Sequence, residues 1–201
     1  MRTVDGYQKW LSESFGEEDA RKILATYPAS ADAEAMASAR QLFTDFLFVE
    51  PTIEVSRAVA SKSPVYLYRF TRVNAIGRAT NMGAHHAAEV VYVFGTYNAP
   101  LFPVPGQGFD ETDFALGKAM MGAWVQFART GDPNGPGLAK WPRYSANNPQ
   151  CLEFGDAPST IQLPDNSRID LLYSVFKQAR ARREAETQTS KASLPGIDHR
   201  Y

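Results

Sequence analysis

Four helical patterns precede the first strand pattern, and this order restricts what the chain can fold into. Their apolar residues recur every three or four positions, as on one face of a helix. The predicted helices cover residues 3–15, 17–27, 32–49 and 51–59. Gly16 and Pro28 end the first two, and Pro51 stands where a first helical turn accepts proline. Because a complete α/β domain would open with strands, we expect a helix-rich segment that leads into a sheet.

The first strand is predicted over residues 64–70, where Pro64 is followed by aliphatic and aromatic side chains and by Arg69. A short run that is nearly apolar throughout is typical of a strand covered on both faces. A loop-like segment, residues 74–83, follows it with two glycines and two asparagines. Ligands of open α/β sheets bind beyond the carboxyl ends of the strands, so we expect a site after this strand.

Two of the three histidines, His85 and His86, stand side by side at this place, within the stretch Gly83–Gly95. Histidine titrates near neutrality and is the usual proton carrier in catalysis. A histidine on a loop above a hydrophobic scaffold is a better functional candidate than one inside a core. The residues alone leave two interpretations open, a structural histidine and a catalytic one, and favour the structural one.

The composition excludes several classes of function. A chain of 201 residues with 44% hydrophobic residues can form one domain with a core. Its net charge of −1 gives no attraction to nucleic acid or acidic membranes. The single cysteine, Cys151, excludes an internal disulfide and a cysteine-based zinc cluster. No apolar run approaches about 18 residues, as a membrane span needs. Residues 1–5 lack the apolar region of a signal peptide, so any signal would lie upstream, and a cytoplasmic location is favoured.

The second half of the chain predicts one long helix, one short strand and a last helix. The long helix begins with Asp110 or Thr112 as its cap and runs to Thr130, where Gly131 ends it. Its expected inward face consists of Phe114, Gly117, Met121, Trp124, Val125 and Ala128. A short strand is predicted over residues 151–154 and a helix over 167–186. We expect residues 187–201 to form a disordered tail.

Ser14 lies in a stretch, Ser12–Gly16, that nearly matches the nucleophile elbow of serine hydrolases. That motif places the serine on a strained turn between a strand and a helix, flanked by small residues. Here the preceding segment is helical, the first glycine is replaced by Ser12, and Phe15 is bulky. We therefore expect Ser14 not to act as a nucleophile.

Several stretches together carry a resemblance to a known family. They are Tyr27-Pro28, residues 64–70, Gly83–Glu89 leading to Val93–Gly95, and Trp124–Asn134 with Trp141-Pro142. In order and spacing the chain resembles the C-terminal part of the type-B carboxylesterases, which include para-nitrobenzyl esterases and cholinesterases. The resemblance implies an α/β fold, the C-terminal portion of an α/β-hydrolase fold, over residues 1–186. It also implies hydrolysis of carboxylic esters by a Ser, Glu/Asp, His triad.

The resemblance assigns site residues by position. The family pattern is a glycine, two variable residues and the catalytic histidine, with a glutamate three residues further on. His86 therefore matches the catalytic histidine and Glu89 the glutamate, with His85 as a supporting neighbour. The family's serine elbow, triad acid and oxyanion-hole glycines would precede Met1. The implied partners are the N-terminal half of the hydrolase domain and a small ester substrate, without nucleic acid or a membrane span. No cofactor is expected.

Three hypotheses follow from this assignment. The first is a portion of a carboxylesterase that supplies only the triad histidine and is inactive alone. The second is a non-catalytic, cholinesterase-like partner module, for which a retained His86 is not needed. The third is a metal site formed by His85, His86 and Glu89. We expect no metal there, because adjacent histidines point apart, no third ligand lies nearby, and His199 belongs to the tail.

Overall fold

The computed structural model describes residues 1–98, 108–163 and 167–192. The chain divides into two units, the first formed by Met1–Glu54 with Asp165–Tyr201 and the second by Val55–Pro164. Each unit has its own hydrophobic core. The expectation of one hydrolase-domain portion over residues 1–186 stays a prediction.

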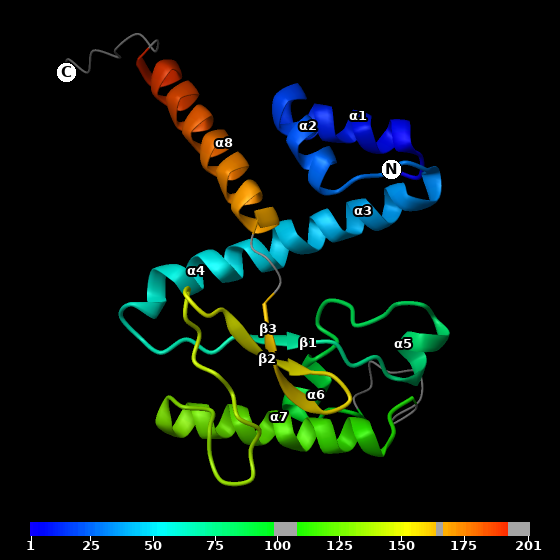
Figure 1. Cartoon of the computed structure of the whole chain (residues 1–201), viewed down its shortest axis with the longest axis vertical. Coiled ribbons are helices and arrows are strands. Elements are labelled where there is room, and N and C mark those ends of the chain that lie inside the picture. The colour runs from blue at the N-terminus through cyan, green and yellow to red at the C-terminus, as the bar shows by residue number, and fades with distance from the viewer. Residues whose placement is uncertain (99–107, 164–166, 193–201) are drawn as a thin grey trace, which may run out of the picture. The chain divides into compact units, whose positions relative to one another are not determined.

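The first unit is helical (Figure 1). Its elements are α1 (Val4–Phe15), α2 (Glu17–Thr26), α3 (Asp32–Thr44), the π-helical turn η1 (Asp45–Val49), the first residues of α4 (Glu50–Ala60), and α8 (Ser167–Ala192). The helices predicted before the first strand are therefore confirmed. Pro51 does not open a separate helix, because η1 and α4 continue directly from α3. The π-helical turn η1 has i→i+5 hydrogen bonds and therefore contains more residues per turn than the α-helical segments on either side of it.

Hydrogen bonds join the buried tyrosines of the first unit. The Tyr7 hydroxyl donates to the carbonyl oxygen of Tyr27 (3.1 Å), and the Tyr27 hydroxyl donates to Oδ2 of Asp45 (2.9 Å). Arg168 lies 3.7 Å from the same Asp45 oxygen, so the buried carboxylate has a cation beside it. Burial raises the pKa of Tyr7 to about 12. These polar groups are satisfied inside an otherwise apolar core.

The second unit is built on a three-stranded sheet in the order β1-β2-β3. The strand β1 (Tyr68–Phe70) pairs in parallel with β2 (Gln150–Phe154), and β2 pairs antiparallel with β3 (Pro158–Gln162). Between β1 and β2 the chain forms α5 (Ala75–Ala79), α6 (Val90–Phe94) and α7 (Glu111–Thr130). The helix α7 runs along one face of the sheet (Figure 1), where Leu116 and Met120 share a core with Leu152 and Phe154.

The first strand differs from its prediction. It is three residues long, and only Leu67 of residues 64–70 is buried, while Tyr68 is 41% exposed. Within the described residues β1 is an edge strand of the sheet and pairs on one side only. The prediction that both faces of this strand are covered is therefore wrong for most of its residues. The strand at residues 151–154 is confirmed as part of β2, β3 was not predicted, and the loop-like segment 74–83 contains α5.

The long helix α7 has the predicted ends, but its inward face matches the prediction only in part, at Gly117 and Trp124. Asp110 caps it through a capping box with Asp113, and Gly131 ends it in the left-handed conformation. Phe114 is 46% exposed, and Val125 and Ala128 are also exposed. The buried residues are Asp113, Leu116, Gly117, Met120 and Ala123. The inward face was misplaced because a charged residue, Asp113, lies on it.

The last helix extends further than predicted. It begins at Ser167 as expected and continues to Ala192, so residues 187–192, expected in the disordered tail, are helical. The remaining tail residues, 193–201, lie outside the described residues. Among the described helices none has the length and apolar character needed to cross a membrane.

Candidate functional site

The predicted histidine pair lies on a turn that enters α6. Both His85 and His86 are exposed, as expected for a site and not for a core. The N–H of Ala88 donates to the carbonyl oxygen of His85 (3.1 Å), and the N–H of Val90 donates to that of Ala87 (3.2 Å). These bonds close a tight turn immediately before the helix. The turn therefore fixes the backbone on both sides of His86.

Ala87, the residue after His86, has a φ of 65°. This left-handed conformation costs a residue with a Cβ about 1 kcal/mol or more. Gly83, at the other end of the histidine turn, also has a positive φ, of 64°, where glycine bears no such cost. Strain in a non-glycine residue next to a candidate catalytic group is typical of functional sites.

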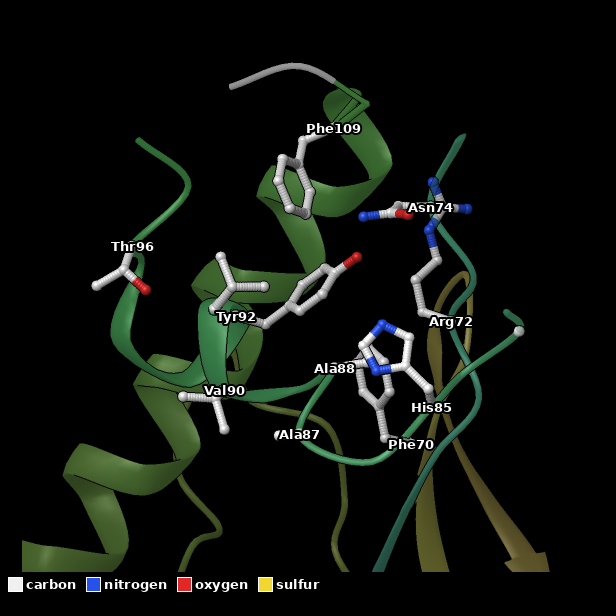
Figure 2. A pocket seen from close by; sticks show the side chains of 12 residues that line it. Phe70, Arg72, Asn74, His85, Ala87, Ala88, Val90, Tyr92, Thr96 and Phe109 are labelled. Atoms are coloured by element: carbon white, nitrogen blue, oxygen red, sulfur yellow. The ribbon is translucent and has the colours of Figure 1, made fainter. Parts of the chain in front are cut away.

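His85 faces a cavity of about 310 Å³ within the second unit. Figure 2 shows its ring among the side chains that line the cavity, including Phe70, Arg72, Asn74, Tyr92 and Phe109. The Nδ1 atom of His85 lies 2.9 Å from the carbonyl oxygen of His86. This contact restrains the orientation of the His85 ring.

Glu89 is half-buried and contacts β1. The hydroxyl of Tyr68 donates to its Oε1 over a long distance of 3.5 Å. Burial, followed by the nearby Glu89 charge, raises the pKa of Tyr68. The structure thus joins Glu89 to the edge strand, and His85 to the backbone of His86.

A charge network centred on the buried pair Arg72 and Asp113 lies beside the histidine turn, and no motif in the sequence indicated it. The Arg72 guanidinium donates to three carboxylates, those of Asp110, Asp113 and Asp156, at 2.7–3.1 Å. Tyr92 donates to Oδ1 of Asp113 (2.7 Å). The only sequence signal was the position of Arg72 two residues after the predicted strand.

The network sets the ionisation of its members. Burial raises the pKa of Asp113, but hydrogen bonds from Arg72 and Tyr92 outweigh it and hold that pKa below its ordinary value. Burial and the bond to Asp113 raise the pKa of Tyr92, and the bond to Asp113 raises the pKa of Arg72. Asp113 is therefore a carboxylate and Tyr92 a neutral phenol at neutral pH.

Two other sequence hypotheses can be compared with the structure. Ser14 lies in α1, so the strand–turn–helix setting of a nucleophile elbow is absent at this serine. Among the described residues no group of three or more His, Cys, Asp or Glu side chains is arranged to hold a metal ion.

Comparison with known proteins places this turn in a family context. The sequence model of the Carboxylesterase family matches residues 3–172, a range that includes the whole histidine turn. The chain belongs to the carboxylesterase family. Its first two helices, its sheet and α7 all fall within the matched range.

Individual relatives of this carboxylesterase chain agree with the assignment. It is 34% identical to a fumonisin B1 esterase of Sphingopyxis macrogoltabida, over 77% of this chain and 28% of that protein. It is also 34% identical to the pyrethroid hydrolase Ces2a of Mus musculus, over 61% of this chain and 22% of that protein. A thermophilic PNB esterase structure superposes with a TM-score of 0.67 and 22% identity, covering 85% of this chain and 33% of that one.

These comparisons show the α/β-hydrolase fold, of which the present chain is a helix-rich portion with a small sheet. The chain spans about a third or less of the length of the relatives it matches.

Proposed function

We propose that His86 is the general base of a carboxylic ester hydrolase, acting on a serine that this chain does not supply. One observation carries the proposal. His86 is exposed on the turn that joins the β1 side of the sheet to α6, and Ala87 beside it has a strained, left-handed backbone. The esterase names of the relatives support carboxylic esters as the substrate class.

The mechanism follows from the chemistry of imidazole. Neutral His86 accepts the proton of the serine hydroxyl as its oxygen attacks the ester carbonyl. The resulting imidazolium then donates this proton to the leaving alcohol, and the acyl-enzyme forms. In the second half water attacks the acyl-enzyme carbonyl while His86 accepts a proton from it. The imidazolium then returns this proton to the serine oxygen as the bond between acyl group and serine breaks and the carboxylic acid leaves. An acid residue, also from the remainder of the hydrolase domain, would orient the imidazole.

The second unit offers a surface for that remainder of the domain. Among the described residues β1 pairs only with β2, so its outer edge can accept another strand. Beside it lies an apolar groove of about 590 Å³. Its lining includes Tyr68, Val93, Phe94 and Val125, and Phe94 is 70% exposed. Exposed aromatic and aliphatic side chains next to a free strand edge support the N-terminal half of the hydrolase domain as the partner.

The test is an assay with a para-nitrophenyl ester. We expect the purified 201-residue chain to give no turnover above that of free imidazole, because it supplies the base alone. Co-folding with a family-typical N-terminal portion should restore activity, and His86→Ala in the co-folded protein should abolish it. Robust turnover by the chain alone that disappears in Ser14→Ala would overturn the proposal. If co-folding restores activity and His86→Ala leaves that activity unchanged, the result would instead favour the non-catalytic partner module.

A further inference from the structure

Arg72 and Tyr92 flank the segment that carries both histidines, and both side chains donate a hydrogen bond to the same oxygen atom of Asp113. The Nε of Arg72 lies 2.8 Å from Oδ1 of Asp113, and the hydroxyl of Tyr92 lies 2.7 Å from the same oxygen. Residues 73–91, which include His85 and His86, form the connection between them. The two ends of the histidine segment are thus fixed to one side chain at the start of α7.

The Asp113 carboxylate uses both of its oxygens in this arrangement. Its Oδ2 accepts from Nη2 of Arg72 (3.1 Å) and from the backbone N–H of Asp110 (2.8 Å), which completes the capping box of α7. The Arg72 side chain is 4% exposed and that of Asp113 is fully buried. Hydrogen bonds between charged groups are roughly twice as strong as those between neutral groups, and removing one partner of a buried pair leaves the other charge uncompensated.

The same residues lie next to the histidines. Arg72, Tyr92 and His85 all line the 310 Å³ cavity, as Figure 2 shows. Tyr92 also belongs to α6, the helix that the histidine turn enters. A shift of Tyr92 would therefore move α6 and the turn that carries His86.

We propose that Arg72, Asp113 and Tyr92 form a clamp that positions the histidine turn, with Asp113 and Tyr92 as positioning residues for His86. The catalytic part of this inference rests on the proposed function of His86. The structural part does not rest on that function, since it concerns only how firmly residues 73–91 are held in one conformation. Fixing both ends of this segment lowers the number of conformations open to His86, which a general base needs for efficient proton transfer.

The test compares Tyr92→Phe with Tyr97→Phe in the 201-residue chain. Both changes remove a buried hydroxyl that bonds to Asp113, but Tyr97 donates to its backbone carbonyl oxygen (3.1 Å) and not to its carboxylate. Amide hydrogen exchange is measured by NMR at Ala88 and Val90, with amides of α1 as the reference. We expect Tyr92→Phe to accelerate exchange at Ala88 and Val90 about tenfold over the reference, and Tyr97→Phe by less than about twofold.

A second readout uses the co-folded esterase. Tyr92→Phe should lower kcat about tenfold and leave KM within about twofold, because a misplaced base affects turnover more than binding. Arg72→Lys, which keeps the charge but has no planar fork, should change both readouts in the same direction. It also replaces Tyr92→Phe as the test if that variant does not fold.

Unchanged exchange at Ala88 and Val90 in a folded Tyr92→Phe protein would overturn the clamp. Equal acceleration in Tyr97→Phe would overturn it as well, because loss of any buried hydroxyl would then suffice. Accelerated exchange in Tyr92→Phe alone, without His86-dependent hydrolysis, would support the clamp and reject the proposed function.

Discussion

The indole Nε1 of Trp141 donates a 2.7 Å hydrogen bond to the carbonyl oxygen of Leu67, 74 residues earlier in the chain. The backbone N–H of Leu152 donates to the same oxygen (3.0 Å). Leu67 directly precedes β1. Its carbonyl oxygen therefore joins both β2 and Trp141 to the strand that leads to the histidines. Trp141 also packs against Tyr68, Trp124 and Phe154.

Replacing Trp141 should therefore destabilise the second unit. Trp141→Phe removes a hydrogen bond and part of a buried ring, and we expect a loss of about 2–4 kcal/mol in the free energy of unfolding. Trp124→Phe is the matched control, since Trp124 packs in the same aromatic cluster but is only half-buried, and it should cost less. Urea unfolding followed by circular dichroism measures both. An equal loss in the two variants would mean that the Leu67 bond contributes little.

Because the backbone at Ala87 is strained, glycine substitutions at Ala87 and at Ala84 should change the stability of the protein in different directions. Ala87→Gly should leave stability unchanged or raise it by up to about 1 kcal/mol, because relief of a positive φ outweighs the added flexibility of the unfolded chain. Ala84→Gly, on the same exposed turn but without a positive φ, should lower stability by roughly 0.5–1 kcal/mol. Thermal unfolding of the pair measures the difference. A larger loss in Ala87→Gly than in Ala84→Gly would contradict the strain.

The buried Tyr7 predicts a loss of stability in alkali. Burial raises its pKa to about 12 in the folded protein, above the value of about 10 of an unfolded chain. The folded state therefore favours the protonated phenol. Its contribution is fully present below pH 10 and is lost as the pH rises through about 12. The free energy of unfolding should fall over this window in the wild type and fall less steeply in Tyr7→Phe. Tyr173→Phe, at an exposed tyrosine, should keep the wild-type slope.

Local signals explain what the sequence predicted well. The helix α1 was predicted from apolar residues at helical spacing and from Gly16 at its end, and α7 from Asp110 and Gly131 at its two ends. The exposed position of His85 and His86 followed from the glycine and asparagine residues before them. Each of these features depends on a few neighbouring residues, so the sequence contains the information directly.

The features that were missed depend on distant residues. Asp113 and Arg72 are 41 positions apart, and a charged residue on the buried face of α7 contradicts the apolar pattern used to predict that face. β1 was expected to be covered on both faces because residues 64–70 are nearly apolar, whereas in the structure only Leu67 of these residues is buried. The roles assigned to His86 and Glu89 come from family resemblance and stay predictions.

The most direct test of the central claim compares two adjacent substitutions, His86→Ala and His85→Ala, in the co-folded esterase. Both histidines are exposed on the same turn, so general damage to the turn would affect the two variants alike. We predict that His86→Ala lowers kcat/KM for a para-nitrophenyl ester by about 10⁴-fold or more, as expected for loss of a triad base. His85→Ala should reduce it by less than about tenfold, mainly through binding or stability. Equal losses in the two variants, or a loss confined to His85→Ala, would contradict the assignment of His86 as the general base.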